Sequence, residues 1–197
     1  MKKMTSVTSY QKEIAKRTAL AFDMDKPPIA RFWDDKKENG IYILEAKNSP
    51  QHGVTSYATI GLSEQPLMFK GKEFDARVEL VGVCGSAFHE FANVMATLAF
   101  CVINSGWFCA PGIIFPDVVS MYGKSDTMSD IYFTHPFLWE DRLESELIGD
   151  HKVAWLLAIP ISKAESTFAE THGPEKLEDL FVENNIDIYD LNRVSIV

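Results

Sequence analysis

The sequence predicts an α/β (α+β) sandwich, in which helices pack on one mixed β-sheet. Three observations lead to this prediction: a continuous apolar run, VAWLLAI, at residues 153–159; several shorter strand-like segments; and helix patterns between them. An apolar run with little alternation is typical of a strand buried on both faces, in the middle of a sheet that helices cover. We therefore expect a central strand from Lys152 that ends at Pro160, too short for a helix.

The N-terminal part of the chain predicts one helix and one β-hairpin. Residues 8–22 are amphipathic, with a capping box formed by Thr8 and Gln11. The side chains expected on one side of this helix are Tyr10, Ile14, Arg17 and Leu20. Two apolar segments follow, 29–33 and 40–46, and the Asn39–Gly40 pair between them suits a tight turn.

The middle of the chain predicts two strands and the clearest helix. Residues 54–62 are rich in β-branched and aromatic side chains, and residues 74–81 alternate as in a half-exposed strand. We expect residues 82–86, GVCGS, to form the turn into a helix with Ser86 as N-cap and Gly106 just beyond its end. The apolar stripe of this helix is Phe88, Phe91, Met95, Leu98, Ala99 and Val102.

The C-terminal third predicts two short helices after the central strand. Ser162 and Glu165 form a second capping box, and Pro174 suits the first position of a further helix that carries Leu177, Leu180 and Phe181. The tail, IDIYDLNRVSIV, has no clean period, so we expect a loop with at most a short strand. Because no change in composition marks a boundary, we expect residues 1–197 to form one domain that includes the helix and hairpin of residues 5–46.

Composition narrows the classes of partner. The chain has 197 residues, a formal net charge of −9 and a pI near 5.0. Nucleic acid binding requires a basic face, which is missing here, whereas an acidic protein suits a basic protein partner. The sequence contains no run of 18 apolar residues, so we expect no membrane span. The basic N-terminus lacks the apolar stretch of a signal peptide. Three cysteines without paired spacing indicate reduced thiols in the cytoplasm.

Cys84 is the candidate for catalysis. The order strand, Gly82-x-Cys84-x-Ser86 and helix resembles a nucleophile elbow with sulfur in place of oxygen. A helix N-terminus would lower the pKa of the thiol, and His52, His135 or His151 would have to act as the base. A small buried hydrophobe in a tight turn explains the same pattern. No metal site or cofactor is expected, because Asn93 stands where a zinc-protease helix beginning at His89 needs its second histidine.

An aromatic turn followed by acidic residues is the candidate for partner binding. It comprises Phe137, Trp139, Glu140 and Asp141, after His135-Pro136. If this segment is extended, both rings leave it on one side. Such a group of residues is either a lid on the core or a hot spot of a protein interface.

Long stretches of the chain resemble the suppressor of fused family. They are SDIYFTHPFLWED at 129–141 and KVAWLLAIPISKAESTFAETHGPEKLEDLFVENNIDIYDLNR at 152–193, with support from VTSYATIGLSEQPL at 54–67 and ARVELVG at 76–82. The resemblance implies an α/β domain with a mixed sheet and no enzymatic activity. Animal members of the family have two domains and grip a peptide of a transcription factor between them. We do not expect that activity here, because the sequence has the length of one domain.

Single-domain bacterial members of that family look like immunity proteins, which neutralise toxin domains. We therefore expect a non-enzymatic, cytoplasmic, protein-binding module, with a basic toxin domain as a fitting partner. The alternative from another class is a thiol-dependent enzyme that uses Cys84 as nucleophile. A third interpretation is a scaffold that self-associates, for example as a homodimer.

Overall fold

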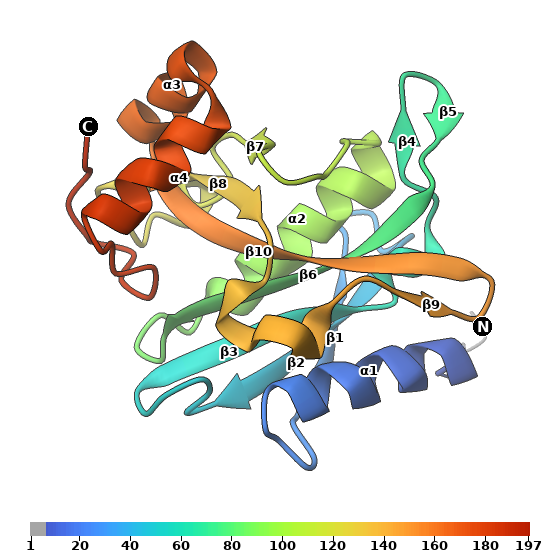
Figure 1. Cartoon of the computed structure of the whole chain (residues 1–197). Coiled ribbons are helices and arrows are strands. Elements are labelled where there is room, and N and C mark those ends of the chain that lie inside the picture. The colour runs from blue at the N-terminus through green and yellow to red at the C-terminus, as the bar shows by residue number, and fades with distance from the viewer. Residues whose placement is uncertain (1–6) are drawn as a thin grey trace.

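The computed structural model describes residues 7–197, so the first residues of the predicted 5–46 segment lie outside it. Its main sheet has eight strands in the order β1-β2-β3-β6-β10-β8-β7, with β9 also paired to β10, and a separate hairpin joins β4 to β5 (Figure 1). The β10–β6 pair is parallel and the other pairs are antiparallel. The predicted mixed sheet with helices packed on it is confirmed.

The elements have the following bounds. The strands are β1 Ile29–Trp33, β2 Gly40–Lys47, β3 Val54–Ile60, β4 Met68–Phe69, β5 Lys72–Glu73, β6 Ala76–Gly85, β7 Ile114–Phe115, β8 Met128–Thr134, β9 Glu146–Ile148 and β10 His151–Ser162. The α-helices are α1 Ser9–Ala21, α2 Phe91–Ser105, α3 Lys163–His172 and α4 Pro174–Glu183. Three 3₁₀ helices are η1 Leu62–Glu64, η2 Ser120–Tyr122 and η3 Phe137–Leu143. No helix among the described residues is long and apolar enough to cross a membrane.

Strand β10 is buried over most of its length, as the apolar run predicts, but Pro160 does not end it. Pairing with β6 stops at Ala158, whereas pairing with β8 continues through Pro160 to Ser162. The carbonyl of Pro160 accepts a hydrogen bond from Arg193 at 3.2 Å, on the edge where β6 is no longer present. The ring nitrogen faces the same edge and therefore removes no bond from the ladder.

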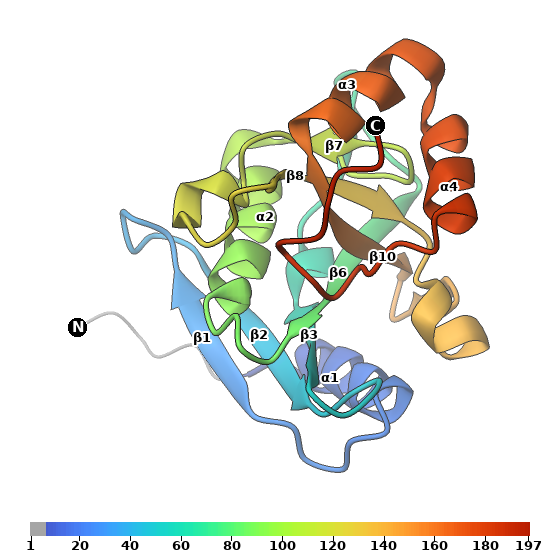
Figure 2. The same ribbon diagram turned by 90° about the vertical axis from the view of Figure 1, so that its left-hand side faces the viewer.

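Helices cover both faces of the sheet (Figures 1 and 2). On one face, α2 packs on Leu80 of β6 and Leu156 of β10. On the other face, Ile14 of α1 and Leu177 and Phe181 of α4 belong to a second apolar cluster. Burial on both faces explains the continuous apolar run of β10.

Helix α1 confirms the predicted capping box, with reciprocal bonds between Thr8 and Gln11. The predicted apolar side of this helix is partly wrong. Ile14 is buried as predicted, but Leu20 is 64% exposed, and the other buried positions are Thr18, Ala19 and Ala21. The hairpin is confirmed, with β1 and β2 paired in the register that places Trp33 opposite Gly40.

Strand β6 corrects two predictions. It is not half-exposed, since residues 78–84 are buried, and it extends through the predicted turn to Gly85. Gly82 lies within the strand, and α2 packs closely on it: a Cβ atom there would lie 2.8 Å from Sδ of Met95. Ser86 does not cap α2, which begins at Phe91. The Ser86 hydroxyl instead lies 2.8 Å from Oγ1 of Thr55. The predicted stop at Gly106 is confirmed, with a left-handed backbone.

A fully buried carboxylate, Glu79, joins β6 to the loop after β3. Its oxygens accept hydrogen bonds from the hydroxyl of Thr59 and from the backbone and hydroxyl of Ser63, at 2.6–3.0 Å. The backbone N–H of Gly61 donates a further bond at 2.9 Å. Burial raises the pKa of Glu79 to about 7, although these donors act in the opposite direction.

The C-terminal segment is packed rather than free, and it forms no strand in the described structure. Arg193 makes two parallel hydrogen bonds to the buried carboxylate of Glu165, at 2.6 and 2.7 Å. Glu165 also completes the predicted capping box with Ser162 at the start of α3, which is confirmed. One carboxylate therefore connects the tail, α3 and the end of β10.

We expect Glu79→Ala to lower the free energy of unfolding by about 2–4 kcal/mol, because several buried donors lose their acceptor. The pKa of Glu79 in the folded state is raised above its ordinary value. Between about pH 4.5 and 7 the folded protein therefore binds more protons at this residue than the unfolded chain does. The contribution of Glu79 to stability is thus complete at low pH and falls as the pH rises through 7. Urea titrations at pH 5 and pH 8 should show a smaller effect of the substitution at pH 8; an equal effect would contradict the raised pKa.

Candidate partner-binding site

The aromatic turn is a 3₁₀ helix, η3, and not an extended segment. Phe137 and Trp139 therefore do not leave the chain on one side. Phe137 is 54% exposed, whereas Trp139 is 1% exposed. Asp141 is exposed, and the side chain of Glu140 lies outside what the structure describes. The turn thus offers Phe137 and Asp141 to solvent.

Trp139 belongs to the core of the α1 face. The centroid of its ring lies 4.7 Å from the ring centroid of Phe22, which follows the last residue of α1. The sequence left open whether the turn is a lid on the core or an interface. Trp139 acts as a lid, since nearly all of its surface is buried, and only Phe137 is placed as an interface residue would be.

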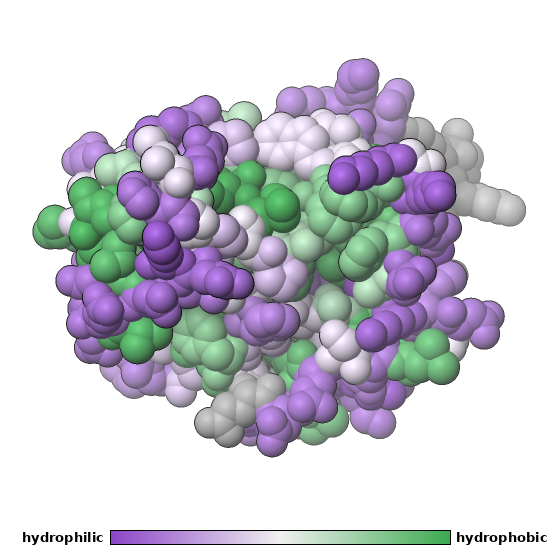
Figure 3. Space-filling view, turned by 45° about the horizontal axis from the view of Figure 1, so that its top comes forward, coloured by the Kyte–Doolittle hydropathy of each residue, from purple (hydrophilic) through white to green (hydrophobic). Residues whose placement is uncertain are grey.

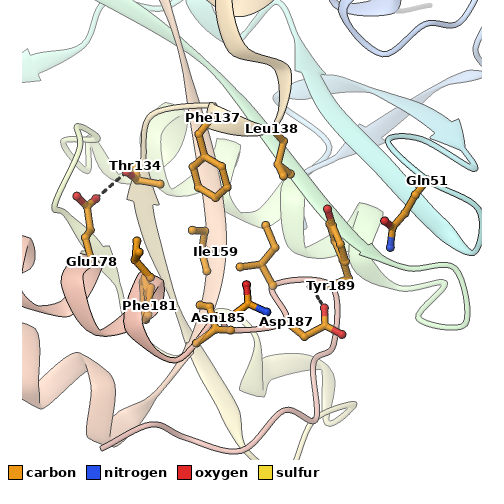
Figure 4. A pocket seen from close by; sticks show the side chains of 13 residues that line it. Gln51, Thr134, Phe137, Leu138, Ile159, Glu178, Phe181, Asn185, Asp187 and Tyr189 are labelled. Carbon is orange, nitrogen blue, oxygen red and sulfur yellow. Dashed lines mark hydrogen bonds between the residues drawn. The ribbon is translucent and has the colours of Figure 1, made fainter.

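Phe137 stands at the edge of an open groove between η3 and α4 (Figure 4). The groove has a volume of about 680 Å³. Its floor comes from Ile159 of β10 and Thr134 of β8, and its walls from η3, α4 and the segment after α4. The lining residues are Gln51, Thr134, Phe137, Leu138, Ile159, Glu178, Phe181, Val182, Asn185, Ile186, Asp187, Ile188 and Tyr189.

The groove combines apolar walls with carboxylates and has no basic lining residue. Glu178 accepts hydrogen bonds at one oxygen from Tyr132 and Thr134, at 3.0 and 2.6 Å. Burial of Tyr132 and the neighbouring charge of Glu178 raise the pKa of Tyr132 above its ordinary range, so this tyrosine stays protonated and remains a donor. Asp187 accepts a bond from the backbone of Tyr189 at 2.9 Å. The site therefore suits an apolar group that carries or adjoins a positive charge.

A second apolar surface lies near the β4–β5 hairpin and the end of α2, on the right of the face shown in Figure 3. Phe69 and Phe74 are exposed, and their rings pack on Phe108 at 4.5 and 5.4 Å between centroids. Phe69 and Phe74 also line an open pocket of about 350 Å³ beside the hairpin, together with charged side chains of residues 70–75. Lys70 lies 5.0 Å from the centroid of Phe69.

Cys84 lacks the features that the thiol-enzyme alternative requires. It lies inside β6, fully buried, and six residues separate it from the first residue of α2. Burial raises the pKa of the Cys84 thiol to about 12, which is the reverse of activation. Among the described residues no hydrogen bond joins Cys84 to a histidine, and no group of three metal-ligating side chains occurs.

The comparisons with known proteins agree with this architecture. The family model of suppressor of fused protein (SUFU) matches residues 37–194, and the chain belongs to this family. Among curated proteins, the chain is 44% identical over 191 residues to Immunity protein YqcF of Bacillus subtilis (strain 168). The match covers 97% of this chain and 99% of that protein.

Solved structures show the same fold at low sequence identity. A putative SUFU homolog from Neisseria gonorrhoeae has a TM-score of 0.67 at 19% identity, with 95% of this chain and 97% of that chain covered. The Sufu–Fu complex has a TM-score of 0.65 at 12% identity, with 94% of this chain and 89% of that chain covered. Drosophila Suppressor of Fused has a TM-score of 0.64 at 11% identity. The match covers 93% of this chain but only 50% of that larger chain.

We expect Trp139→Ala to lower the free energy of unfolding by about 3–5 kcal/mol, because it leaves a large cavity beside Phe22. Phe137→Ala, in the same turn, should cost less than about 1 kcal/mol because that ring is largely exposed. Urea denaturation of both variants measures the difference. Equal costs would mean that Trp139 is not a core residue.

We expect iodoacetamide to label all three cysteines slowly in the folded protein near pH 7.5. Cys101, the most accessible, should react first, although burial raises its pKa to about 11. Cys84 and Cys109 should react only as the protein unfolds, which mass spectrometry of labelled peptides would show. Rapid and selective labelling of Cys84 would instead restore the thiol-enzyme alternative.

Proposed function

We propose that this chain is an immunity-type protein that binds a protein toxin domain in the cytoplasm and neutralises it without catalysis. The observation that carries the proposal is the 44% identity to Immunity protein YqcF, which extends over nearly the whole of both chains. Coverage of this kind argues against a shared fragment attached to an unrelated protein. The buried, deactivated Cys84 gives the thiol-enzyme alternative no support.

The charge of the chain supports a basic toxin domain as the partner. A net charge of −9 creates a negative field that attracts a basic protein and speeds its association. Toxin domains that act on nucleic acids need a positive surface to hold phosphates. An acidic inhibitor that covers such a surface would exclude the substrate by occupying its place.

The first test is purification of the tagged chain from its native host at moderate salt. We expect one near-stoichiometric partner, identified by mass spectrometry. The isolated partner domain should kill a bacterial host when expressed alone, and growth should return when this chain is expressed with it. Because the attraction is electrostatic in large part, the affinity of the purified pair should fall steeply as salt is raised.

The controls separate neutralisation from simple capture. Trp139→Ala tests whether rescue needs the folded protein, and it should rescue less well at higher temperature. A captured partner that is harmless by itself, or whose toxicity this chain does not relieve, would overturn the proposed function. So would the absence of any partner in a host that demonstrably expresses a toxin.

A further inference from the structure

We propose that the groove between η3 and α4 is the toxin-docking site, and that it receives a projecting segment with an apolar side chain flanked by lysine or arginine. This inference rests on the proposed function and specifies the chemistry of its partner. It differs from the sequence-based expectation, because the docking surface is formed mainly by α4 and the tail. Of the aromatic turn, only the face that carries Phe137 takes part.

The interior of the groove explains the apolar part of the partner. A volume of about 680 Å³ is in the range of cavities that enclose a ligand or several side chains. Ile159, Leu138 and Phe181 line it from three different elements, so an inserted side chain would be surrounded by apolar atoms (Figure 4). Val182, 80% exposed, stands at the rim where it would meet the partner.

The charge around the groove explains the basic part. Helix α4 and the turn after it carry most of the surplus negative charge of the chain: Glu175, Glu178, Asp179, Glu183, Asp187 and Asp190, against one cation, Lys176. Two of these carboxylates line the groove itself, and each has an oxygen without a hydrogen bond in the described structure. A lysine or arginine beside the inserted side chain would pair with them.

The same charge argues against a second copy of this chain as the occupant. Two molecules that meet through their grooves would bring acidic helices together, and like charges at an interface cost affinity. A basic partner has no such cost. The attraction of a basic partner and the repulsion of a second copy of this chain therefore both favour a basic protein as the occupant.

The groove is also held open before any partner binds. The carbonyl of Tyr189 accepts a hydrogen bond from Gly85 of β6 at 2.8 Å, and Ile186 donates one to Phe181 at 3.2 Å. These bonds fix the segment after α4 at both ends of the wall. A fixed wall lowers the entropy that binding must overcome.

The test compares Val182→Arg with Leu147→Arg, using the toxin domain that the wild-type chain captures and neutralises. Both substitutions place the same charge at an exposed apolar position, 80% and 71% exposed, but Leu147 lies on β9 and does not line the groove. We expect Val182→Arg to weaken binding by about tenfold or more and Leu147→Arg by less than about threefold. Thermal unfolding should show that both variants remain folded.

A second comparison tests the charge. Glu178→Gln removes a carboxylate that lines the groove, and Glu175→Gln removes one from the same helix outside it. We expect a larger loss of affinity and a shallower salt dependence for Glu178→Gln.

The outcomes distinguish the two levels of the proposal. If the wild-type chain neutralises its toxin but Val182→Arg binds as well as Leu147→Arg, the groove is not the docking site, although the proposed function stands. If the wild-type chain neutralises no toxin, both proposals fail. A groove occupied by a second copy would appear as a dimer that Val182→Arg dissociates, and this result would also overturn the inference.

Discussion

The buried ion pair between Glu165 and Arg193 is the interaction on which the C-terminal half of the structure depends. Its two hydrogen bonds, at 2.6 and 2.7 Å, join residues that are 28 positions apart in the chain. Neither side chain can be lost alone without leaving a buried charge, which typically costs about 3–5 kcal/mol. Through Glu165 the pair supports the first turn of α3, and through Arg193 it supports Pro160. The wall of the groove lies between these fixed points.

Features that follow from neighbouring residues could be predicted from the sequence. Both capping boxes, the β1–β2 hairpin and the left-handed stop at Gly106 depend on contacts a few residues apart, and all are confirmed. Features decided by distant partners could not. Gly82 was interpreted as a turn residue, but it lies in β6, where α2 packs closely on it. Ser86 bonds to Thr55 instead of capping a helix.

The candidate site was predictable only in part, for the same reason. An aromatic and acidic turn is visible in the sequence, but its 3₁₀ conformation is what separates exposed Phe137 from buried Trp139. Nothing in the sequence placed α4 opposite this turn. The signal available in the sequence was the run of carboxylates at residues 175–190, next to the apolar Ile186 and Ile188. Family membership, in contrast, was visible in long local motifs and is confirmed.

The fixed wall of the groove has a kinetic consequence. A surface that needs no rearrangement can bind at each productive encounter, so association would be governed by diffusion in the field of the acidic helix. Related partners would then differ little in how fast they arrive and much more in how long they stay. Residence time would depend on how well an inserted side chain fills the space above Ile159. Small changes in that one side chain would be enough to separate a partner that is held from one that escapes.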